Sequence, residues 1–396
     1  MSFSSFSSLS GLPVPTSSHA LSPYGWDEEW AAAFAPYAER GLLPGRVVRV
    51  DRGQCDLVTP DGPMRADTAF VVGRDPMRVV CTGDWVAVDP GGDPRFVRTL
   101  LPRRTAFVRS TSSQRSEGQV LATNIDHIVI CVSLAVELDL GRLERFLALA
   151  LSSSSGDALL GDGDGDGDGQ ETGGPEPRPI VLLTKADLVP DGATQAHLVQ
   201  DVEGIAPGVR VLPVSSATGE GIDVFRALVS GGTSVLLGIS GAGKSTLANT
   251  LLGEDVMHVN AARDVDGKGR HTTTTRNLLV LPEGGVLIDT PGLRGVGLWD
   301  AEAGVGQVFA EIEDLARKCR FHDCAHEAEP GCAVLGAVEE GALPERRLGS
   351  YRKLLRENHR IAAKTDARLR SETLREWKRR GAEGRAAVDV KRGRLR

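Results

Sequence analysis

A short apolar run leads into a glycine-rich loop in the stretch Thr233-Ser234-Val235-Leu236-Leu237-Gly238-Ile239-Ser240-Gly241-Ala242-Gly243-Lys244-Ser245-Thr246. The segment from Gly238 to Ser245 matches the phosphate-binding P-loop pattern, Gly-x4-Gly-Lys-Ser, in full. Leucines follow at helical spacing, so a strand, a loop and a helix are predicted in the order that the motif requires. The competing interpretation is a glycine-rich turn that matches by chance, and the flanking elements argue against it.

Each part of the predicted P-loop has a role in holding phosphate. Glycines let the backbone turn tightly and present consecutive N–H groups to phosphate oxygens, and the following helix adds its positive N-terminal end. Lys244 is expected to contact the β- and γ-phosphates and to act in catalysis, and the Ser245 hydroxyl to hold Mg²⁺. The predicted phosphate-binding residues are Gly238, Ile239, Ser240, Gly241, Ala242, Gly243, Lys244, Ser245 and Thr246.

Length and composition limit the classes of protein to which the chain can belong. The 396 residues, 41% hydrophobic and 25% charged, are typical of a soluble protein of two or three domains. No run of apolar residues is long enough to predict a membrane span, so no membrane partner is expected. Of six cysteines, three lie close together beside histidines and three stand alone, which predicts a metal cluster and buried thiols in a cytoplasmic protein.

The charge is distributed unevenly along the chain. Residues 342–396 carry 18 Lys and Arg against 7 Asp and Glu, a net charge of +11. The whole chain carries −7, which leaves −18 for the other residues. A basic C-terminal part on an acidic body predicts a polyanionic partner such as RNA, although a solvated charged helix explains the charge alone equally well.

Short strands separated by turns are predicted within residues 44–110. The expected strands are 45–50, 55–59, 67–72, 79–81, 84–88 and 95–100. They suit a small β-barrel, and the OB-fold is the common barrel that binds oligonucleotides. The arginines that form a candidate RNA-binding face are Arg46, Arg49, Arg74, Arg78, Arg95, Arg98, Arg103 and Arg104. Interleaved acidic residues leave open a β module without RNA, and residues 1–43 are expected to be a disordered tail and lead-in.

Strand and helix patterns alternate through residues 111–300. Expected strands at 126–132, 180–183, 209–214, 235–237 and 286–288, with helices at 140–151, 224–229 and 244–252, predict a doubly wound α/β domain. Residues 152–177 interrupt it with serines and repeated Gly-Asp pairs. This segment is expected to be a flexible insertion, because it lacks the glutamate and apolar positions of known calcium loops.

Two loops after predicted strands have the residues that read guanine. In Thr184-Lys185-Ala186-Asp187, the Asp187 carboxylate can accept both N–H groups at the edge of guanine, which adenine does not offer. Lys185 is expected to pack its stem along the base. Ser215 and Ser216, after the strand 209–214, resemble the weaker base-contacting loop. The chain is therefore predicted to prefer GTP over ATP.

A further element, Asp289-Thr290-Pro291-Gly292, follows the strand 286–288. Asp289 is expected to hold Mg²⁺ through water, and the Gly292 N–H to sense the γ-phosphate. Within residues 269–275, Thr273 or Thr274 is the candidate switch threonine that caps the metal.

No glutamine is present to orient the attacking water, because Leu293 stands directly after the Asp-x-x-Gly glycine. The hypothesis is that intrinsic hydrolysis is slow, and that His271 or a group of a docking partner positions the water. A purely structural role for His271 remains open.

The base-reading loops precede the P-loop, whereas in ordinary GTPases they follow it. Since every motif still comes directly after an apolar strand, a circularly permuted GTPase is predicted. The switch region then leads within about twenty residues into whatever follows, so a change at the γ-phosphate is expected to reach a C-terminal module.

That C-terminal module contains the spacing Cys319-x4-Cys324-x-His326-x5-Cys332. Three thiolates and one imidazole form a closed tetrahedral set, which predicts one structural Zn²⁺. His322 is a nearby competitor as ligand. The metal is expected to hold helices at 305–318 and 345–357 in a zinc-binding domain of residues 301–360, followed by a basic tail of residues 361–396.

With these motifs the chain resembles the ribosome small-subunit-dependent GTPases of the RsgA/YjeQ type over roughly residues 23–360. Further marks are Tyr24-Gly25-Trp26, Ala122-Thr123-Asn124-Ile125-Asp126 and Gly269-Arg270-His271-Thr272-Thr273-Thr274. The resemblance implies an OB-fold, a permuted GTPase and a zinc domain. It also implies GTP hydrolysis to GDP and phosphate, stimulated by the small ribosomal subunit during its late maturation.

The partners expected from this resemblance are the small subunit with its rRNA, and GTP or GDP, for a monomeric protein. Departures from the family pattern are Thr184 in place of asparagine, Ser216 in place of alanine, the 152–177 insertion and the long tail. Two other classes stay open: another P-loop enzyme such as an ATPase or kinase, and a zinc-bearing RNA-binding scaffold with regulatory nucleotide binding.

Overall fold

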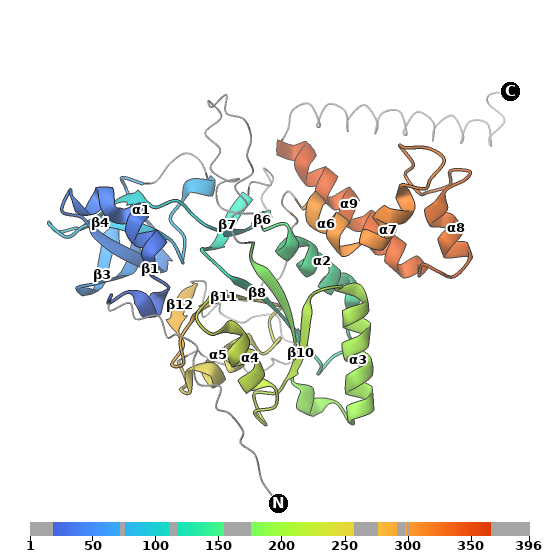
Figure 1. Cartoon of the computed structure of the whole chain (residues 1–396), viewed down its shortest axis with the longest axis horizontal. Coiled ribbons are helices and arrows are strands. Elements are labelled where there is room, and N and C mark those ends of the chain that lie inside the picture. The colour runs from blue at the N-terminus through green and yellow to red at the C-terminus, as the bar shows by residue number, and fades with distance from the viewer. Residues whose placement is uncertain are drawn as a thin grey trace, which may run out of the picture.

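The protein is described from a computed structural model of the 396-residue chain (Figure 1). The structure describes residues 19–71, 76–110, 118–153, 176–256, 276–290, 298 and 301–365. This part of the chain holds a small β-barrel, an α/β sheet and a group of C-terminal helices, which lie in that order from left to right of the view. Among the described residues, no helix combines the length and the apolar character that crossing a membrane requires.

The barrel is closed and has five strands in the order β1-β2-β3-β5-β4. The strands are β1 (Leu43–Asp51), β2 (Gln54–Thr59), β3 (Gly62–Asp67), β4 (Trp85–Asp89) and β5 (Phe96–Leu100). Its apolar core includes Val47, Leu57 and Val86, which come from alternate positions of three strands. β3 and β5 pair in parallel, and all other pairs are antiparallel. This arrangement is the predicted OB-fold.

Two of the predicted barrel strands are wrong. The strand expected at 67–72 lies earlier, because β3 begins directly at Gly62 and the chain turns after Asp67, whose carboxylate accepts a hydrogen bond from the Ala69 N–H. The strand expected at 79–81 is a loop after a short 3-10 turn, η2 (Pro76–Arg78). Asp84 holds this loop by accepting a hydrogen bond from the Cys81 N–H at 2.7 Å. Carboxylates that bond to nearby backbone compete with strand pairing.

The lead-in before the barrel contains a short 3-10 turn, η1 (Ser22–Tyr24), and helix α1 (Glu28–Ala38). Asp27 caps the helix by accepting a hydrogen bond from the Trp30 N–H. Trp26, Trp30 and Phe34 are buried and pack with Trp85 of the barrel. The aromatic residues of this segment therefore extend the barrel core, and residues 1–18 of the predicted tail lie outside the described residues.

Two of the arginines that were assigned to the candidate RNA-binding face of the barrel are buried and not available for it. Arg46 is buried, stacks on Trp85 and contacts the Thr233 hydroxyl, and Arg103 is buried in an ion pair with Asp84. Others are paired on the surface: Arg49 with Asp51, Arg98 with Asp89 and Arg104 with Asp27. Arg74 lies outside the described residues.

A six-stranded sheet in the order β10-β9-β8-β11-β13-β12 forms the centre of the molecule. The strands are β8 (His127–Ser133), β9 (Arg178–Thr184), β10 (Arg210–Val214), β11 (Thr233–Leu237), β12 (Asn277–Val280) and β13 (Val286–Asp289). All pairs are parallel except that of β12 with β13. The five strands predicted from apolar runs are confirmed, and the antiparallel edge strand β12 is an addition.

Helices cover both faces of this sheet. They are α2 (Leu140–Leu151), α3 (Gly192–Ile205), α4 (Ile222–Val229) and α5 (Lys244–Leu252). Residues of α2 and α3 share one apolar cluster with the sheet, and residues of α4 and α5 share a second cluster on the opposite face. A hairpin of β6 (Ala106–Ser110) and β7 (Gly118–Thr123) links barrel and sheet. Residues 154–175, most of the predicted insertion, lie outside the described residues.

The C-terminal helices are α6 (Glu302–Val308), α7 (Ala310–Ala316), α8 (Ala333–Glu339) and α9 (Glu345–Thr365). The single helix expected at 305–318 is divided at Phe309, which is fully buried against Tyr351 and Arg347. α9 extends eight residues past the predicted end. α6 lies so close to α2 that a Cβ at Gly304 would collide with the Ala148 carbonyl. This close contact attaches the C-terminal helices to the α/β sheet.

Candidate functional site

Four loops that carry the predicted nucleotide-binding motifs leave the same edge of the sheet. The P-loop follows β11, and the loops at Thr184, Ser215 and Asp289 follow or end β9, β10 and β13. These strands are parallel and close together in the sheet, so their carboxyl ends meet at one edge. Ligands of open α/β sheets bind at this edge, and the predicted GTP residues are therefore brought to one place.

The P-loop has the backbone conformation that its glycines permit. Gly238, Gly241 and Gly243 have φ values of 149°, 84° and 82°, which side chains rarely adopt. A Cβ at Gly238 would lie 2.6 Å from the Cys131 carbonyl oxygen of the neighbouring strand β8. Ser240 and Gly241 at the tip of the loop are exposed, so their backbone is open to a ligand. α5 begins at Lys244 and directs its N-terminus to the same point.

Lys244 lies across the P-loop with its ammonium group held by backbone. Nζ donates to the Gly238 carbonyl at 2.9 Å and to the Ile239 carbonyl at 3.1 Å. The side chain is 7% exposed, and this burial lowers the pKa of the ammonium group. A largely desolvated positive charge at the start of a helix is suited to phosphate.

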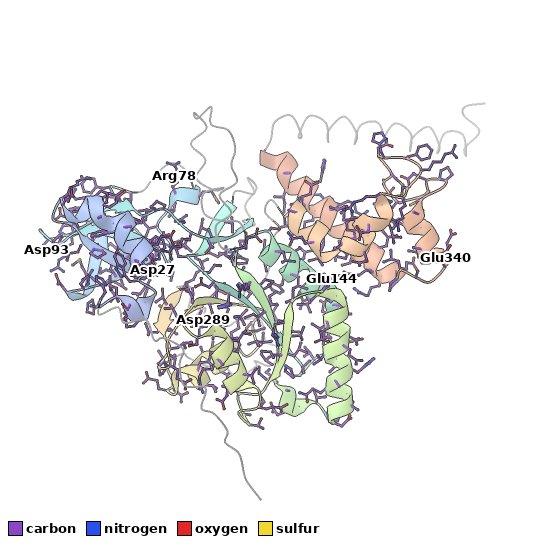
Figure 2. The ribbon with its side chains drawn as sticks, viewed as in Figure 1. Asp27, Arg78, Asp93, Glu144, Asp289 and Glu340 are labelled. Carbon is purple, nitrogen blue, oxygen red and sulfur yellow. The ribbon has the colours of Figure 1, made fainter. Side chains whose placement is uncertain are left out.

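Asp289 lies at the end of β13 (Figure 2) and is buried. Its Oδ1 has no hydrogen-bond partner among the described residues. Burial raises the pKa of this carboxyl group, and the nearby charge of Lys244 opposes that shift. A buried carboxylate oxygen without a partner is costly, and a cation or its bound water would satisfy it. The donor set of Asp289 and Ser245 therefore fits Mg²⁺.

The loop that is predicted to read guanine presents an oriented carboxylate. Asp187 is exposed, and its Oδ1 accepts a hydrogen bond of 2.5 Å from the Ser215 hydroxyl. The same hydroxyl oxygen accepts hydrogen bonds from the N–H groups of Ala217 and Thr218, both at 3.2 Å. Ser215 thus connects the two base loops, and Asp187 keeps free lone pairs that face solvent.

Thr184 joins the base loop to the P-loop. Its hydroxyl group contacts the Ala242 carbonyl at 2.9 Å and the Val132 carbonyl at 3.2 Å. Thr184 and Ala186 are buried, so they position the loop, while Lys185 and Asp187 are more accessible. The threonine that departs from the family pattern therefore makes a link between motifs.

Several predicted site residues lie outside the described residues: His271, Thr273, Thr274, Gly292 and Leu293. Sequence reasoning missed the role of Thr290, whose buried hydroxyl donates to the Leu236 carbonyl and ties the end of β13 to the P-loop strand. It also missed Cys131, whose carbonyl restricts Gly238 to glycine. Neither contact has a sequence signal, because each depends on which strands are neighbours.

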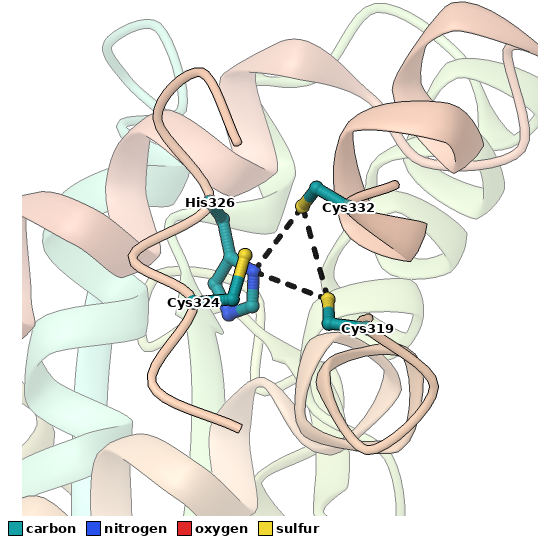
Figure 3. A group of neighbouring side chains, drawn as sticks. All are labelled: Cys319, Cys324, His326 and Cys332. Carbon is teal, nitrogen blue, oxygen red and sulfur yellow. Dashed lines mark hydrogen bonds between the residues drawn. The ribbon is translucent and has the colours of Figure 1, made fainter. Parts of the chain in front are cut away.

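The four predicted zinc ligands converge in the C-terminal helices (Figure 3). The ligand atoms of Cys319, Cys324, His326 and Cys332 all lie within 4.8 Å of one another. The His326 Nδ1 atom is 3.4 Å from the Cys332 Sγ and 3.6 Å from the Cys319 Sγ, and these two sulfurs are 3.8 Å apart. A tetrahedron with Zn–S bonds of about 2.3 Å has edges of roughly 3.8 Å, so the group fits a zinc ion.

The loop that carries these ligands has its own support. The Glu329 carboxylate accepts hydrogen bonds from the N–H groups of Ala325 at 2.9 Å and Glu327 at 2.8 Å. Backbone hydrogen bonds, with its own N–H first, lower the pKa of Glu329 to about 2. His326 has a φ of 58°, so the loop holds a residue in the left-handed region to direct its ring inward. His322 is not part of the converging group.

Comparison with known proteins agrees with this geometry. The sequence model of the RsgA GTPase family matches residues 175–299. The Small ribosomal subunit biogenesis GTPase RsgA of Streptomyces avermitilis is 71% identical over 388 residues, which is 98% of this chain and 99% of that one. The protein of the same name from Streptomyces coelicolor is also 71% identical, over 96% of this chain and 99% of that one.

Solved structures are similar at the level of the fold. YjeQ from Thermotoga maritima aligns with a TM-score of 0.53 and 23% identity, over 80% of this chain and 98% of that one. YloQ, described as a circularly permuted GTPase, aligns with a TM-score of 0.50 and 21% identity, over 80% and 95%. The predicted permutation is confirmed, and the chain belongs to the RsgA family of GTPases.

Proposed function

We propose that this protein is a GTPase that binds the small ribosomal subunit and acts in its late maturation, hydrolysing GTP to GDP and phosphate. The observation that carries the GTPase function is the meeting of the P-loop, Asp289 and the Ser215–Asp187 pair at one edge of the sheet. The ribosomal role rests on the relatives at 71% identity, whose names describe small-subunit biogenesis. We place the protein in the cytoplasm as a monomer that contacts rRNA.

In this mechanism the chain holds GTP at both ends. Asp187, oriented by Ser215, accepts the N–H groups of guanine, and the Lys185 stem packs along the base. The P-loop N–H groups and Lys244 hold the β- and γ-phosphates and oppose the charge that develops on them during hydrolysis. Mg²⁺, when bound by Ser245, Asp289 and Thr273 or Thr274, neutralises phosphate charge.

The attacking water needs a group that positions it. Leu293 stands where a water-positioning glutamine would follow the Asp-x-x-Gly glycine. We assign this role to His271 or to a group on the ribosome, so that the intrinsic rate is slow and rises on docking. Binding of the subunit would then determine when GTP is cleaved.

We assign the Cys3His cluster to one structural Zn²⁺. It joins Cys319, three residues after the end of α7, to the start of α8, where Cys332 caps the helix and accepts a hydrogen bond from the Leu335 N–H. A closed set of four protein ligands leaves no position for substrate, so the metal stabilises the fold of this module.

Asp187→Asn is expected to weaken GTP binding by about 10²–10⁴-fold, since it removes two charge-assisted hydrogen bonds of about 1.5–3 kcal/mol each. The new amide N–H can instead donate to the 2-oxygen of xanthine, so a xanthosine nucleotide should bind better than GTP. Competition of both nucleotides against a labelled guanine nucleotide measures this. Asp223→Asn, an exposed carboxylate of α4, is the control and should keep the preference for GTP.

Cys332→Ser is expected to remove one equivalent of zinc and to expose the α7–α8 region to protease, because a serine hydroxyl does not replace a thiolate ligand. Metal content by mass spectrometry and limited proteolysis measure the two effects. Cys81→Ser, a buried thiol in the described barrel region, should keep the metal. Retention of a full equivalent of zinc by Cys332→Ser would contradict the assignment.

Co-sedimentation with purified small subunits tests the proposed function. We expect the protein to bind with a non-hydrolysable GTP analogue and to be released with GDP. Binding that does not depend on the nucleotide would instead support an RNA-binding scaffold, and a lack of binding in both states would contradict the proposal.

A further inference from the structure

An exposed aromatic pair stands on the barrel, away from the nucleotide site. Phe70 follows β3 and is 61% exposed, although large aromatic side chains usually lie inside. Phe96, the first residue of β5, is partly buried, and its ring centre lies 4.8 Å from that of Phe70 at an angle of 73°. More than half of the Phe70 side chain is therefore exposed on a support that the barrel fixes.

Arg98 completes this surface. Its guanidinium group lies 4.7 Å from the Phe70 ring centre and 5.6 Å from the Phe96 ring centre. Asp89 holds it in place, with hydrogen bonds of 2.7 Å and 3.2 Å. We name Phe70, Phe96 and Arg98 the aromatic platform. An aromatic ring beside a flat cation is the kind of surface on which a nucleobase stacks.

A polar cavity of about 360 Å³ lies beside the platform, between the β2–β3 strands and the β4–β5 loop that Asp93 marks in Figure 2. Its wall is next to Phe96 in the barrel, because Asp67 pairs with Phe96 and Arg95 precedes it in the chain. Arg95, also in the wall, is exposed, and among the described residues its side chain contacts the Pro90 carbonyl at 3.4 Å. Arg65, by contrast, is neutralised by Asp51 and Asp56.

We infer that the aromatic platform and this cavity bind one unpaired nucleotide of single-stranded RNA, with its base stacked on Phe70 and its phosphate against Arg95. The carboxylates of Asp67 and Asp93 are acceptors for exocyclic amino groups of the base. The face is the one that OB-folds use for oligonucleotides, formed by strands 2–3 and the β4–β5 loop. This inference rests on the proposed function, because it assigns the proposed rRNA contact to these residues of the barrel.

The base must be unpaired, since a base inside a duplex has both faces covered by its neighbours. RNA fits better than a protein partner, because the surface joins an exposed ring, a stacked guanidinium and Arg95, which has no carboxylate within ion-pair distance in the part of the chain that the structure describes. A protein hydrophobic hot spot would bury apolar side chains in a pocket, whereas the cavity here is lined mainly by polar residues.

Fluorescence anisotropy with a labelled ten-nucleotide single-stranded RNA, and with the same sequence as a duplex, tests the inference on the full chain. Phe70→Ala should weaken single-strand binding by between about fivefold and 150-fold, which is the range for one stacked base. Phe70→Trp should bind within about twofold of the wild type. Val136→Ala, at a side chain that is 62% exposed elsewhere, is the control.

The dependence on salt separates stacking from charge. Phe70→Ala should lower affinity by the same factor at low and high salt, whereas Arg95→Gln should reduce the slope of log affinity against log salt by about 0.7. Basal GTP turnover should not change in either variant. The inference is overturned if Phe70→Ala binds like the control, or if the duplex binds as tightly as the single strand.

Small-subunit binding separates the inference from the proposed function. If Phe70→Ala loses subunit binding but keeps single-strand binding, the platform contacts a ribosomal protein and the inference fails. If the wild type binds the single-stranded RNA but not the small subunit, the proposed function is contradicted and the inference that the platform binds single-stranded RNA is supported.

Discussion

Lys244→Ala is expected to lower basal GTP turnover by about 10²–10³-fold, which is the usual effect of removing one preorganised electrostatic contact from a transition state. Lys244 is 7% exposed, and its ammonium group is held over the P-loop by the Gly238 and Ile239 carbonyls. Its charge therefore lies where negative charge develops on the phosphates, with little screening by water. Steady-state phosphate release measures the loss.

The control for Lys244→Ala is Lys353→Ala, an exposed lysine of α9. This variant should keep basal turnover, because its charge is remote from the sheet edge. The fold of Lys244→Ala should be intact, since burial of the ammonium group lowers its pKa and is a cost to the free protein. Turnover within threefold of the wild type in Lys244→Ala would contradict the assigned role.

Glu144→Ala is expected to destabilise the C-terminal helices by about 3–5 kcal/mol, the usual cost of removing one partner from a buried ion pair. Glu144 of α2 is fully buried and lies on the side of the sheet that the C-terminal helices cover (Figure 2). It accepts hydrogen bonds of 2.9 Å from both Arg346 and Arg347, and a further one from Ser350. In the alanine variant, Arg347 stays buried and loses its contact with the Glu144 carboxylate, while the Glu311 carboxylate still contacts it at 2.6 Å.

Thermal unfolding and limited proteolysis measure this loss. Glu144→Gln should lie between alanine and the wild type, because it keeps the hydrogen-bonding shape and removes the charge. The control is Glu340→Ala, an exposed glutamate at the end of α8. We expect Glu144→Ala to keep basal GTP turnover and to lose the response to small subunits. Unchanged stability would show that the α2–α9 network contributes little.

The parts that could be predicted from the sequence are those whose signals are local. A P-loop is predicted from glycines that lie between an apolar strand and a helix. The helix after it, α5, begins and ends at the predicted residues. The zinc ligands were predictable for the same reason, because their spacing within one loop limits the geometry. The motif order alone predicted the permutation, since each motif needs only its own strand.

The parts that could not be predicted depend on contacts between distant segments. Arg46 was assigned to an RNA-binding face, but Trp85 and Thr233, far along the chain, enclose it. The break at Phe309 arises because Tyr351 and Arg347 bury that ring, and no helix-breaking residue marks it. The Glu144 network likewise joins residues about 200 positions apart, which a linear pattern does not reveal.

GTP turnover by the wild-type chain, measured with and without purified small ribosomal subunits, tests the account most directly. The geometry provides phosphate binding and guanine recognition, and the chain has leucine where a water-orienting glutamine would stand. We therefore predict slow turnover for the free protein and a rise of at least about tenfold with small subunits, but not with large subunits. Equal turnover in the presence and absence of small subunits would contradict the account.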